Sequence, residues 1–427
     1  MTDNEEYIID IKSIASDGCG VGHIDGLTVF VPFTVPGDTV KVRIDDIKPR
    51  FARAKLVKVI SPSKDRIKPD CDIYEVCGGC SMRHITYEAE LCEKRGIVEN
   101  AMRRIGGFTD FALSAVTGME NPERYRNKTV FQAENGEFGF YAPKSHRFTA
   151  VSDCLLGIEE NSNIIRAVRE YISESGTYMN AVKNLFIRKA FKSGEIMVVL
   201  NVRRDIKNRS ILIKKLSALN VTSVILEKDS KYETIFGKSS IYDLLCGIRF
   251  EISPESFFQI NPVQTERLYN KALEFADIKP DDTVMDIYCG IGTISLCASR
   301  HAKKVTGIEF VSRAVDNARK NAENNGIKNA EFYAGKAENI VPQLIKNGEK
   351  PDTVILDPPR SGSDKKTLGA IIRANPKRIV YVSCNPATLA RDTRFLAENG
   401  YEITAAEAFD MFPRTNHAET VVKMEKI

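Results

Sequence analysis

A cysteine near the C-terminal end is the first residue whose position suggests chemistry. Cys384 lies in Ser383-Cys-Asn-Pro386, between a predicted strand over Arg378–Val382 and a helix that Pro386 would begin, with Asn385 as its cap. The free amides and the dipole at a helix N-terminus stabilise a thiolate. Cys384 is therefore a candidate nucleophile, whereas the alternative is a small cysteine that only fills the core.

A carboxylate close to the C-terminus is a candidate for the accompanying base. Glu419 lies in His417-Ala-Glu-Thr420, among otherwise apolar neighbours and at the start of a predicted terminal strand. A reaction with a nucleophile on one side of a substrate needs a group of this kind on the other side to remove a proton. By itself the pattern also fits an ordinary surface glutamate.

Three further cysteines have the spacing of metal ligands, Cys71-x5-Cys77-x2-Cys80. The two glycines between Cys77 and Cys80 allow a tight turn that can wrap a metal. A tetrahedral thiolate site needs a fourth ligand: Cys92 is near but falls in a predicted helix over 88–105, and Cys154 is distant but lies in a loop-like segment. The spacing fits zinc and an iron–sulfur cluster equally, because both accept four cysteines.

These residues belong to a chain of 427 residues, enough for two to three domains of about 150 residues each. The composition, 43% hydrophobic and 28% charged, is that of a globular protein and excludes disordered, collagen-like and membrane classes. The sequence has no secretory signal and no run of 18 apolar residues, which predicts a cytoplasmic protein without a membrane partner. In that reducing compartment, metal binding, catalysis or packing explains ten cysteines better than disulfides do.

Residues 1–62 are predicted to form a small OB-like β-barrel. Short alternating segments separated by Gly and Pro indicate its strands, for example Asp38–Arg43 and Ala54–Ile60. The net charge of the whole chain is only +4, yet ten basic residues and four acidic ones lie between Lys41 and Asp70. Such an excess can neutralise phosphates, although a solvated charged face would look the same.

The rest of the chain divides into a mixed α+β domain over 63–262 and a C-terminal domain over 263–427. Helices and strands alternate from Gln264 onward, with one helix expected over 312–324, and this alternation is typical of a Rossmann-like, doubly wound parallel sheet. Sheets of this kind bind ligands beyond the carboxyl ends of their strands. Those ends are expected to converge at residues 286–292, 309, 357–360 and 383–386.

The first strand, turn and helix of that sheet are typical of a nucleotide cofactor site. Asp286 can anchor the turn, and the glycines of Gly290-Ile-Gly292 let the backbone approach a ligand. The third glycine of a dinucleotide fingerprint is absent, which disfavours NAD. Glu309, at the end of the next strand, can accept both hydroxyls of a ribose. The set resembles the first half of class I S-adenosylmethionine-dependent methyltransferases.

A second loop of the sheet indicates which kind of atom receives the methyl group. Asp357-Pro-Pro-Arg360 follows a predicted strand over Thr353–Leu356, and its prolines stiffen the loop. Amino-methyltransferases commonly have an aromatic residue in the fourth position, where this chain has the cation Arg360. The difference disfavours methylation of an exocyclic amine and leaves room for chemistry on a ring carbon.

Together, the segments around Asp357, Cys384 and Glu419 resemble the RNA uridine-5 methyltransferase family over nearly the whole chain. Gly18–Ile60 is similar to a TRAM domain, an RNA-binding barrel in which Phe51 and its basic neighbours would hold RNA. The resemblance implies a [4Fe-4S] cluster on Cys71, Cys77, Cys80 and Cys154. TRAM domain and cluster together point to the branch that modifies 23S rRNA, because the bacterial transfer-RNA branch typically lacks both.

The same resemblance assigns the site residues. It implies that Cys384 attacks carbon 6 of uracil, so that carbon 5 can take the methyl group, and that Glu419 then removes the carbon 5 proton. The implied contacts with S-adenosyl-L-methionine are Gln259, within Phe257-Phe-Gln-Ile-Asn-Pro262, and Tyr288, Glu309 and Asp357.

Three other interpretations stay open at this point. The same reaction on transfer RNA and a dual-site ribosomal enzyme are the nearer alternatives, because nothing in the residues fixes which uridine is chosen. A non-catalytic RNA-binding iron–sulfur protein, retaining the sheet as a scaffold, would be expected to lose the cofactor and nucleophile motifs, which this chain keeps. A monomer is the default expectation for the oligomeric state.

Overall fold

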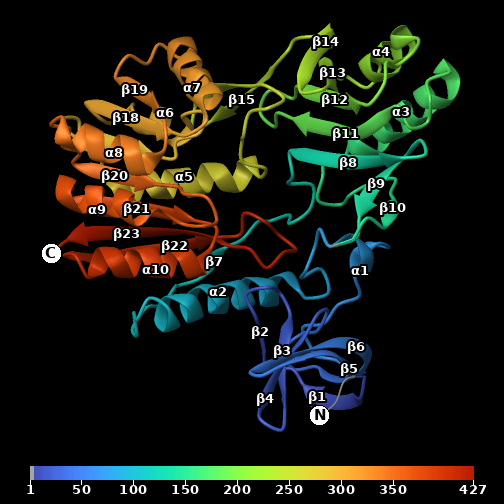
Figure 1. Cartoon of the computed structure of the whole chain (residues 1–427), viewed down its shortest axis with the longest axis horizontal. Helices are drawn as coiled ribbons and strands as arrows, with labels where there is room; N and C mark the ends of the chain where they lie inside the picture. The colour runs from blue at the N-terminus through green and yellow to red at the C-terminus, as the bar shows by residue number, and fades with distance from the viewer. Residues whose placement is uncertain (1–3, 144) are drawn as a thin grey trace. The chain divides into compact units, whose positions relative to one another are not determined.

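The computed structural model describes residues 4–143 and 145–427, and these form two compact units. Figure 1 shows the course of the chain through its helices and strands. The first unit contains the chain up to Pro122, together with residues 384–391 and 407–420. The second unit contains residues 123–383, 392–406 and 421–427. The chain therefore passes from one unit to the other several times near its C-terminal end.

Six strands of the first unit form the N-terminal sheet. They are β1 (Glu6–Asp10), β2 (Ser13–Ile14), β3 (Gly20–Ile24), β4 (Leu27–Val31), β5 (Thr39–Lys48) and β6 (Phe51–Ser61), in the order β1-β5-β6-β4-β3-β2. Alternate residues of β5, namely Val40, Val42 and Ile44, are buried in one apolar cluster with residues of the neighbouring strands. The predicted strands are confirmed, and the pairings form an open series, so closure of the barrel stays a prediction.

The first unit also contains α1 (Tyr74–Cys77), α2 (Tyr87–Arg104) and the short strand β7 (Val116–Thr117). Strand β7 pairs with Ala408 and Phe409, which also belong to this unit. The predicted helix over 88–105 is α2, and its apolar stripe buries Ile97, Val98 and Met102. Ile105 lies outside the helix and is exposed.

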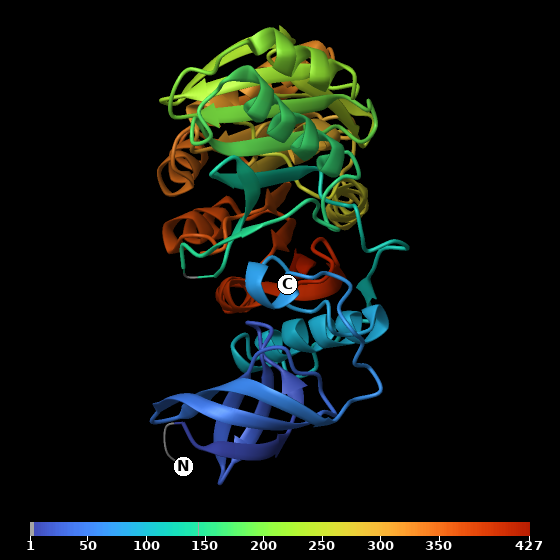
Figure 2. The same cartoon turned by 90° about the vertical axis from the view of Figure 1, so that its right-hand side faces the viewer.

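The second unit begins with a seven-stranded mixed sheet in the order β10-β9-β8-β11-β12-β13-β14, whose strands run from teal to yellow-green in Figure 2. Its strands are β8 (Lys128–Glu134), β9 (Glu137–Tyr141), β10 (Phe148–Ala150), β11 (Val182–Lys189), β12 (Ile196–Val202), β13 (Ser223–Lys228) and β14 (Lys231–Gly237). The helices α3 (Asn161–Ser175) and α4 (Arg209–Ser217) lie between these strands in sequence, and a hairpin of β15 (Ile241–Leu245) and β16 (Ile248–Ile252) follows.

The C-terminal half contains the predicted doubly wound sheet, which is confirmed. Five parallel strands have the order β19-β18-β17-β20-β21, continued by β23 and β22. They are β17 (Thr283–Ile287), β18 (Lys304–Glu309), β19 (Ala330–Ala334), β20 (Thr353–Leu356), β21 (Arg378–Ser383), β22 (Tyr401–Phe409) and β23 (Glu419–Lys426). The connections change direction beside β17, which makes its carboxyl end the topological switch point where such sheets bind ligands.

The helices of this half are α5 (Pro262–Ala276), α6 (Thr293–Ala298), α7 (Ser312–Asn324), α8 (Ala337–Lys346), α9 (Lys365–Ala374) and α10 (Pro386–Ala397). The predicted helix over 312–324 is α7. Strand β19 and helix α8 were absent from the sequence-based prediction. Within the described part of the chain, none of the helices has both the length and the apolar character needed to cross a membrane.

Candidate active site

The turn after β17 has an unusual backbone. Tyr288 has a φ of 71° and Gly292 a φ of 82°, both in the left-handed region, so the chain reverses sharply between β17 and α6. The N–H of Tyr288 donates to the carbonyl of Ile308 at 2.8 Å, which fixes the turn to the neighbouring strand β18. A non-glycine residue in this conformation stores strain, and such strain is concentrated at functional sites.

Two carboxylates fix this turn and the helix that follows it. Buried Asp286 accepts a hydrogen bond from Ser295 Oγ at 2.5 Å, which anchors α6 to β17 as predicted. Glu309 accepts from the N–H of Gly290 at 3.1 Å and, with its other oxygen, from the N–H of Val311 at 2.8 Å. A carboxylate has about four lone-pair sites, so Glu309 retains capacity for the hydroxyls of a ribose.

A small cavity opens above this turn, wholly within the second unit. Three of the four predicted cofactor residues line it, namely Gln259, Tyr288 and Asp357. The fourth, Glu309, bonds to Gly290, which is itself part of the lining. The structure therefore brings the predicted cofactor residues together at the switch point of the sheet. Residues that the sequence did not single out complete the lining, among them Phe258, Tyr269, Ile291 and Thr293.

The environment of Asp357 favours its neutral form. The protein packed around this side chain raises its pKa to about 7, and the neighbouring charge of Asp286 adds to the effect. Burial likewise raises the pKa of Asp286 to about 7, although the bond from Ser295 opposes the shift. A positive charge in the cavity would therefore favour the ionised form of Asp357, which lines it.

Two buried polar residues that were not predicted hold the cavity walls. Asn127 donates from Nδ2 to the carbonyl of Gln259 at 3.0 Å and from its backbone N–H to Ile260 O at 2.8 Å. On the other side, the hydroxyl of Tyr288 lies 3.1 Å from Ser363 Oγ, and the N–H of Ser363 donates to Asp392 at 2.8 Å. No local sequence pattern identifies Asn127 or Asp392, because their partners are distant in the chain.

The two predicted catalytic residues both belong to the first unit. Cys384 is half-buried and lies two residues before the start of α10. Asn385 accepts the N–H of Ala387 with Oδ1 at 3.0 Å, as expected for a cap, and Pro386 begins the helix. Glu419 is buried, with 4% of its surface exposed, and is the first residue of β23.

The four predicted cluster cysteines divide between the units: Cys71, Cys77 and Cys80 lie in the first and Cys154 in the second. Helix α1 ends at Cys77, and Gly78 follows with the left-handed φ of 67° that a tight turn requires. Four thiolates suit an iron–sulfur cluster chemically. However, across residues 4–143 and 145–427 no group of three or more His, Cys, Asp or Glu side chains is positioned to hold a metal ion. We therefore assign no chemical step to a metal.

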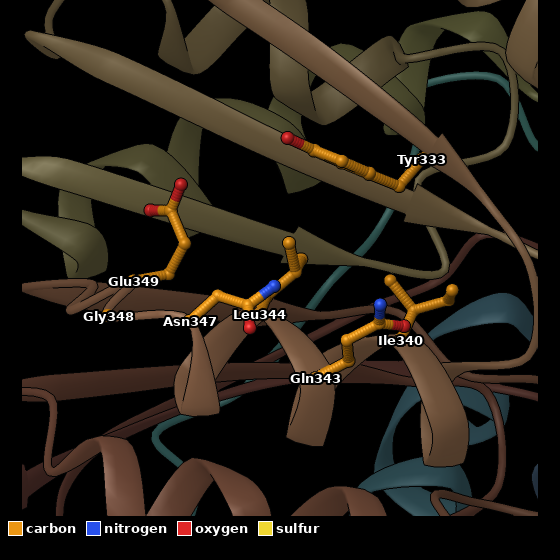
Figure 3. Close-up of a pocket in the computed structure, with 7 residues that line it drawn as sticks. All are labelled: Tyr333, Ile340, Gln343, Leu344, Asn347, Gly348 and Glu349. Atoms are coloured by element: carbon orange, nitrogen blue, oxygen red, sulfur yellow. The ribbon is translucent and has the colours of Figure 1, made fainter.

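A wider hollow of about 550 Å³ lies elsewhere in the second unit, near the end of α8 (Figure 3). Its lining contains Tyr333, Leu344 and Glu349 and none of the predicted site residues. The carboxylate of Glu349 is already paired with Lys304 at 2.7 Å. This hollow is consequently a poor candidate for the reaction site.

Comparison with known proteins decides the family. The family model described as tRNA (Uracil-5-)-methyltransferase matches residues 190–427, more than half of the chain, and the TRAM domain model matches residues 2–57. The chain belongs to the RNA uracil-5-methyltransferase family. Two relatives of this family member, from Clostridium tetani and from Caldanaerobacter subterraneus subsp. tengcongensis, are named as RNA methyltransferases. Each is 40% identical to it, and the alignments cover 99% of this chain and 96% and 98% of the relatives.

A solved structure extends the similarity of this uracil-5-methyltransferase to its whole fold. The Pyrococcus abyssi tRNA (uracil-54, C5)-methyltransferase, crystallised with S-adenosyl-L-homocysteine, is similar with a TM-score of 0.80 and 25% identity. The match covers 98% of this chain and 100% of the other. The prediction of an S-adenosylmethionine-dependent RNA uracil-5 methyltransferase with a TRAM domain is thereby confirmed at the level of the family.

Proposed function

We propose that this protein methylates carbon 5 of a uridine in RNA by covalent catalysis, with Cys384 as the nucleophile and Glu419 as the base. The observation that carries the proposal is the cavity at the end of β17, where Gln259, Tyr288 and Asp357 meet. Family membership supplies the reaction class, and the half-buried Cys384 before α10 and the buried Glu419 are the groups whose chemistry suits it.

The methyl donor, S-adenosyl-L-methionine, carries a sulfonium and an ammonium group. We assign its ribose hydroxyls to Glu309, whose position is fixed by two backbone amides. Gln259, Tyr288 and Asp357 would contact the rest of the molecule from the walls of the cavity. An ionised Asp357 beside the positive groups gains electrostatic stabilisation in a site from which most water is excluded.

The reaction needs a nucleophile because carbon 5 of uracil is a weak one. The Cys384 thiolate bonds to carbon 6 and turns the ring into an enolate. Carbon 5 of the enolate takes the methyl group from the sulfonium, which leaves as S-adenosylhomocysteine. Glu419 then accepts the proton from carbon 5, the electron pair re-forms the ring double bond, and the thiolate leaves carbon 6. Arg360, exposed on the Asp357 loop, is available to meet the enolate oxygen or a phosphate.

The N-terminal sheet has the side chains expected of an RNA-binding surface. Arg53 lies over the ring of Phe30 at 5.8 Å, and Phe30 packs edge-on against Phe51 with ring centroids 5.6 Å apart. Aromatic faces beside cations bind single-stranded RNA through stacking and charge. Because the target base must leave its stack to be reached, we expect a loop or a flipped nucleotide.

For the target we propose 23S rRNA, modified in the cytoplasm by a monomeric enzyme. The second candidate is transfer RNA, which the similar Pyrococcus abyssi enzyme acts on. Mapping 5-methyluridine in the ribosomal and transfer RNA of cells with and without the gene separates the two. Loss of the mark from one 23S rRNA uridine is the expected result. Loss of 5-methyluridine only from transfer RNA would show that transfer RNA is the target. If neither RNA lost 5-methyluridine, the proposed enzymatic function would be refuted.

We also propose that Cys71, Cys77, Cys80 and Cys154 hold a [4Fe-4S] cluster with a structural or RNA-docking role. The support is the donor set and the glycine turn after Cys77. Anaerobic purification should give a brown protein with about four irons per chain. A colourless protein that contains zinc, or no metal at all, would remove the cluster from the proposal and leave the methyl transfer untouched.

A further inference from the structure

A loop from Asp410 to Asn416 leads directly to the proposed base Glu419, and it is held at both ends by polar contacts inside the first unit. We propose that these contacts form a clamp that positions Glu419, with Lys94 and Asn416 as its positioning residues. The inference rests on the proposed role of Glu419. It adds two residues that neither touch the cofactor cavity nor lie in any motif quoted above.

The first end of the clamp is the ammonium of Lys94, on α2. This side chain is completely buried. Its Nζ donates to Asp410 Oδ1 at 2.6 Å, to Glu90 Oε1 at 2.7 Å and to the carbonyl of Phe412 at 3.2 Å. An ammonium has three protons to donate, so these acceptors satisfy it fully. A buried charge is tolerated only with such partners, and here two of the three acceptors belong to the loop.

The carboxylates of Asp410 and Glu90, which bind Lys94, also accept further hydrogen bonds that hold the loop. Asp410 accepts a second hydrogen bond, from the hydroxyl of Tyr87 at 2.7 Å. Glu90 accepts the backbone N–H of Arg414 at 2.7 Å. Arg414 itself has a left-handed φ of 69°, a conformation that costs free energy in a non-glycine residue. The contacts from α2 therefore hold the loop in a shape that it would not keep alone.

The second end of the clamp is Asn416, three residues before Glu419. Its backbone N–H donates to Ser81 Oγ at 2.9 Å, and the Ser81 hydroxyl donates back to Asn416 Oδ1 at 2.9 Å. Its Nδ2 donates to the carbonyl of Ser16 at 2.6 Å. The N–H groups of Ser81 and Met82 both donate to the carbonyl of Arg414, at 2.9 and 3.0 Å. One asparagine thus joins the N-terminal sheet region, the segment after Cys80 and the loop that delivers the base.

The clamp should matter for one step more than for the others. Removal of the carbon 5 proton needs the Glu419 carboxylate within hydrogen-bond reach of that proton, and a displacement of about 1 Å can cost about a hundredfold in rate. Attack by Cys384 and methyl transfer precede this step and do not use Glu419. A loosened clamp should therefore slow elimination, so that methylated RNA accumulates while still bonded to Cys384.

The test compares Asn416→Ala and Ser81→Ala with Glu419→Gln and with a matched control, Asn399→Ala. Asn399 is an exposed asparagine that likewise donates from Nδ2 to one backbone carbonyl, at 2.8 Å, but it belongs to the second unit and has no part in the clamp. The readouts are steady-state turnover, single-turnover methyl transfer, the fraction of RNA bonded to protein on denaturing gels, and the melting temperature.

We expect Asn416→Ala and Ser81→Ala to lower turnover about ten- to hundredfold and to raise the adduct fraction. Single-turnover methyl transfer and the melting temperature, within about 2 °C, should match those of Asn399→Ala. The double variant should be hardly worse than either single one, because both remove the same contact. Lys94→Met should show the same phenotype if it folds; if it does not, the half-buried end formed by Ser81 and Asn416 tests the proposal.

Two outcomes overturn the clamp. The first is unchanged turnover in both Asn416→Ala and Ser81→Ala. The second is lower turnover without more adduct, which would mean that the contacts only stabilise the fold. In either case accumulation of adduct by Glu419→Gln would leave the proposed function standing. If Glu419→Gln accumulates no adduct and still methylates, the role of Glu419 itself fails, and the clamp fails with it.

Discussion

The turn after β17 and the loop before β23 both carry residues of the proposed reaction, but different contacts hold them. The turn is fixed mainly by its own neighbourhood: backbone bonds to β18, a glycine with positive φ, and the carboxylates of adjacent strands. The loop is fixed by side chains of α2 and of Ser81, hundreds of residues earlier in the chain. The turn is thus held mainly by the strands beside it, and the loop before the proposed base by long-range contacts, so we expect mutations to affect the two separately.

The largest expected effect separates chemistry from cofactor binding. Cys384→Ala removes the only nucleophile in the proposed mechanism, so turnover should fall by at least about a thousandfold. The cofactor cavity lies in the second unit and does not include Cys384. Calorimetric titration should therefore give an unchanged dissociation constant for S-adenosylmethionine. Near-normal turnover would exclude covalent catalysis, and loss of cofactor affinity would show that the two regions are not separable.

The second effect concerns the proton that the Asp357 carboxyl carries when no cofactor is bound. The surroundings of Asp357 raise its pKa to about 7, so below that pH the carboxyl is neutral. A positively charged ligand favours the ionised form, so binding should release protons, and affinity should fall up to about tenfold for each pH unit below 7. Titrations from pH 5.5 to 8 in buffers of different ionisation enthalpy measure both quantities. S-adenosylhomocysteine, which lacks the sulfonium, is the control and should show a weaker dependence; equal dependence for both ligands would contradict the assignment.

The third effect tests how far the turn depends on its glycines. A Cβ on Gly292 would lie 3.1 Å from the Phe332 ring and 3.2 Å from Ala318, at a φ of 82°. Gly290 also has a positive φ, 58°, but open space around it. We expect Gly292→Ala to lower the free energy of unfolding by about 2 kcal/mol and Gly290→Ala by about 1 kcal/mol, as measured in urea. Equal losses would show that steric contact contributes nothing at Gly292.

The smallest effect is a change in the slope of stability with pH. Burial raises the pKa of Asp286 to about 7, above its value in the unfolded chain, so the folded state holds this proton more tightly. Its contribution to stability is therefore full below about pH 4 and is lost as the pH rises to about 7. Asp286→Asn removes this dependence while keeping an oxygen for Ser295. As the pH rises from 5 to 8, the free energy of unfolding of the variant should increase relative to that of the native chain. Parallel pH profiles of the two proteins would contradict the raised pKa.

The sequence predicted most of the catalytic sheet because its strands are continuous apolar runs. Strand β20, for example, is buried at every position, and α7 has the predicted limits. Two elements departed from such patterns and were missed. Strand β19 lies at an edge of the sheet and has only one fully buried residue, Phe332. Helix α8 contains Pro342, a residue that normally argues against a helix interior.

The site was predictable in part from strand ends and in part from the family resemblance. The strand ends predicted that Tyr288 and Asp357 converge, the resemblance added Gln259, and all three line one cavity. Asn127 was not predictable, because it lies 132 residues from Gln259, whose carbonyl it holds. Lys94 is separated from Asp410 by 316 residues. One weak signal existed for it: Glu90 and Lys94 are four residues apart on the face of α2 that also carries Val98. Charged residues on an otherwise apolar stripe indicate a buried ion pair.

The repeated passage of the chain between the two units has a consequence for anyone who wants to dissect this protein. A cut of the gene after Pro122 falls at one boundary between the units, but that cut alone does not separate them. The segments 384–391 and 407–420 belong to the same compact body as the N-terminal sheet and α2. A fragment that begins at Glu123 would keep the cofactor cavity and lose the partners of Asp410 and Asn416. Transplanting the N-terminal part onto another methyltransferase would likewise leave Cys384 and Glu419 behind. To exchange substrate specificity in such a chimaera, the chain up to Pro122 and the segments 384–391 and 407–420 would all have to be exchanged.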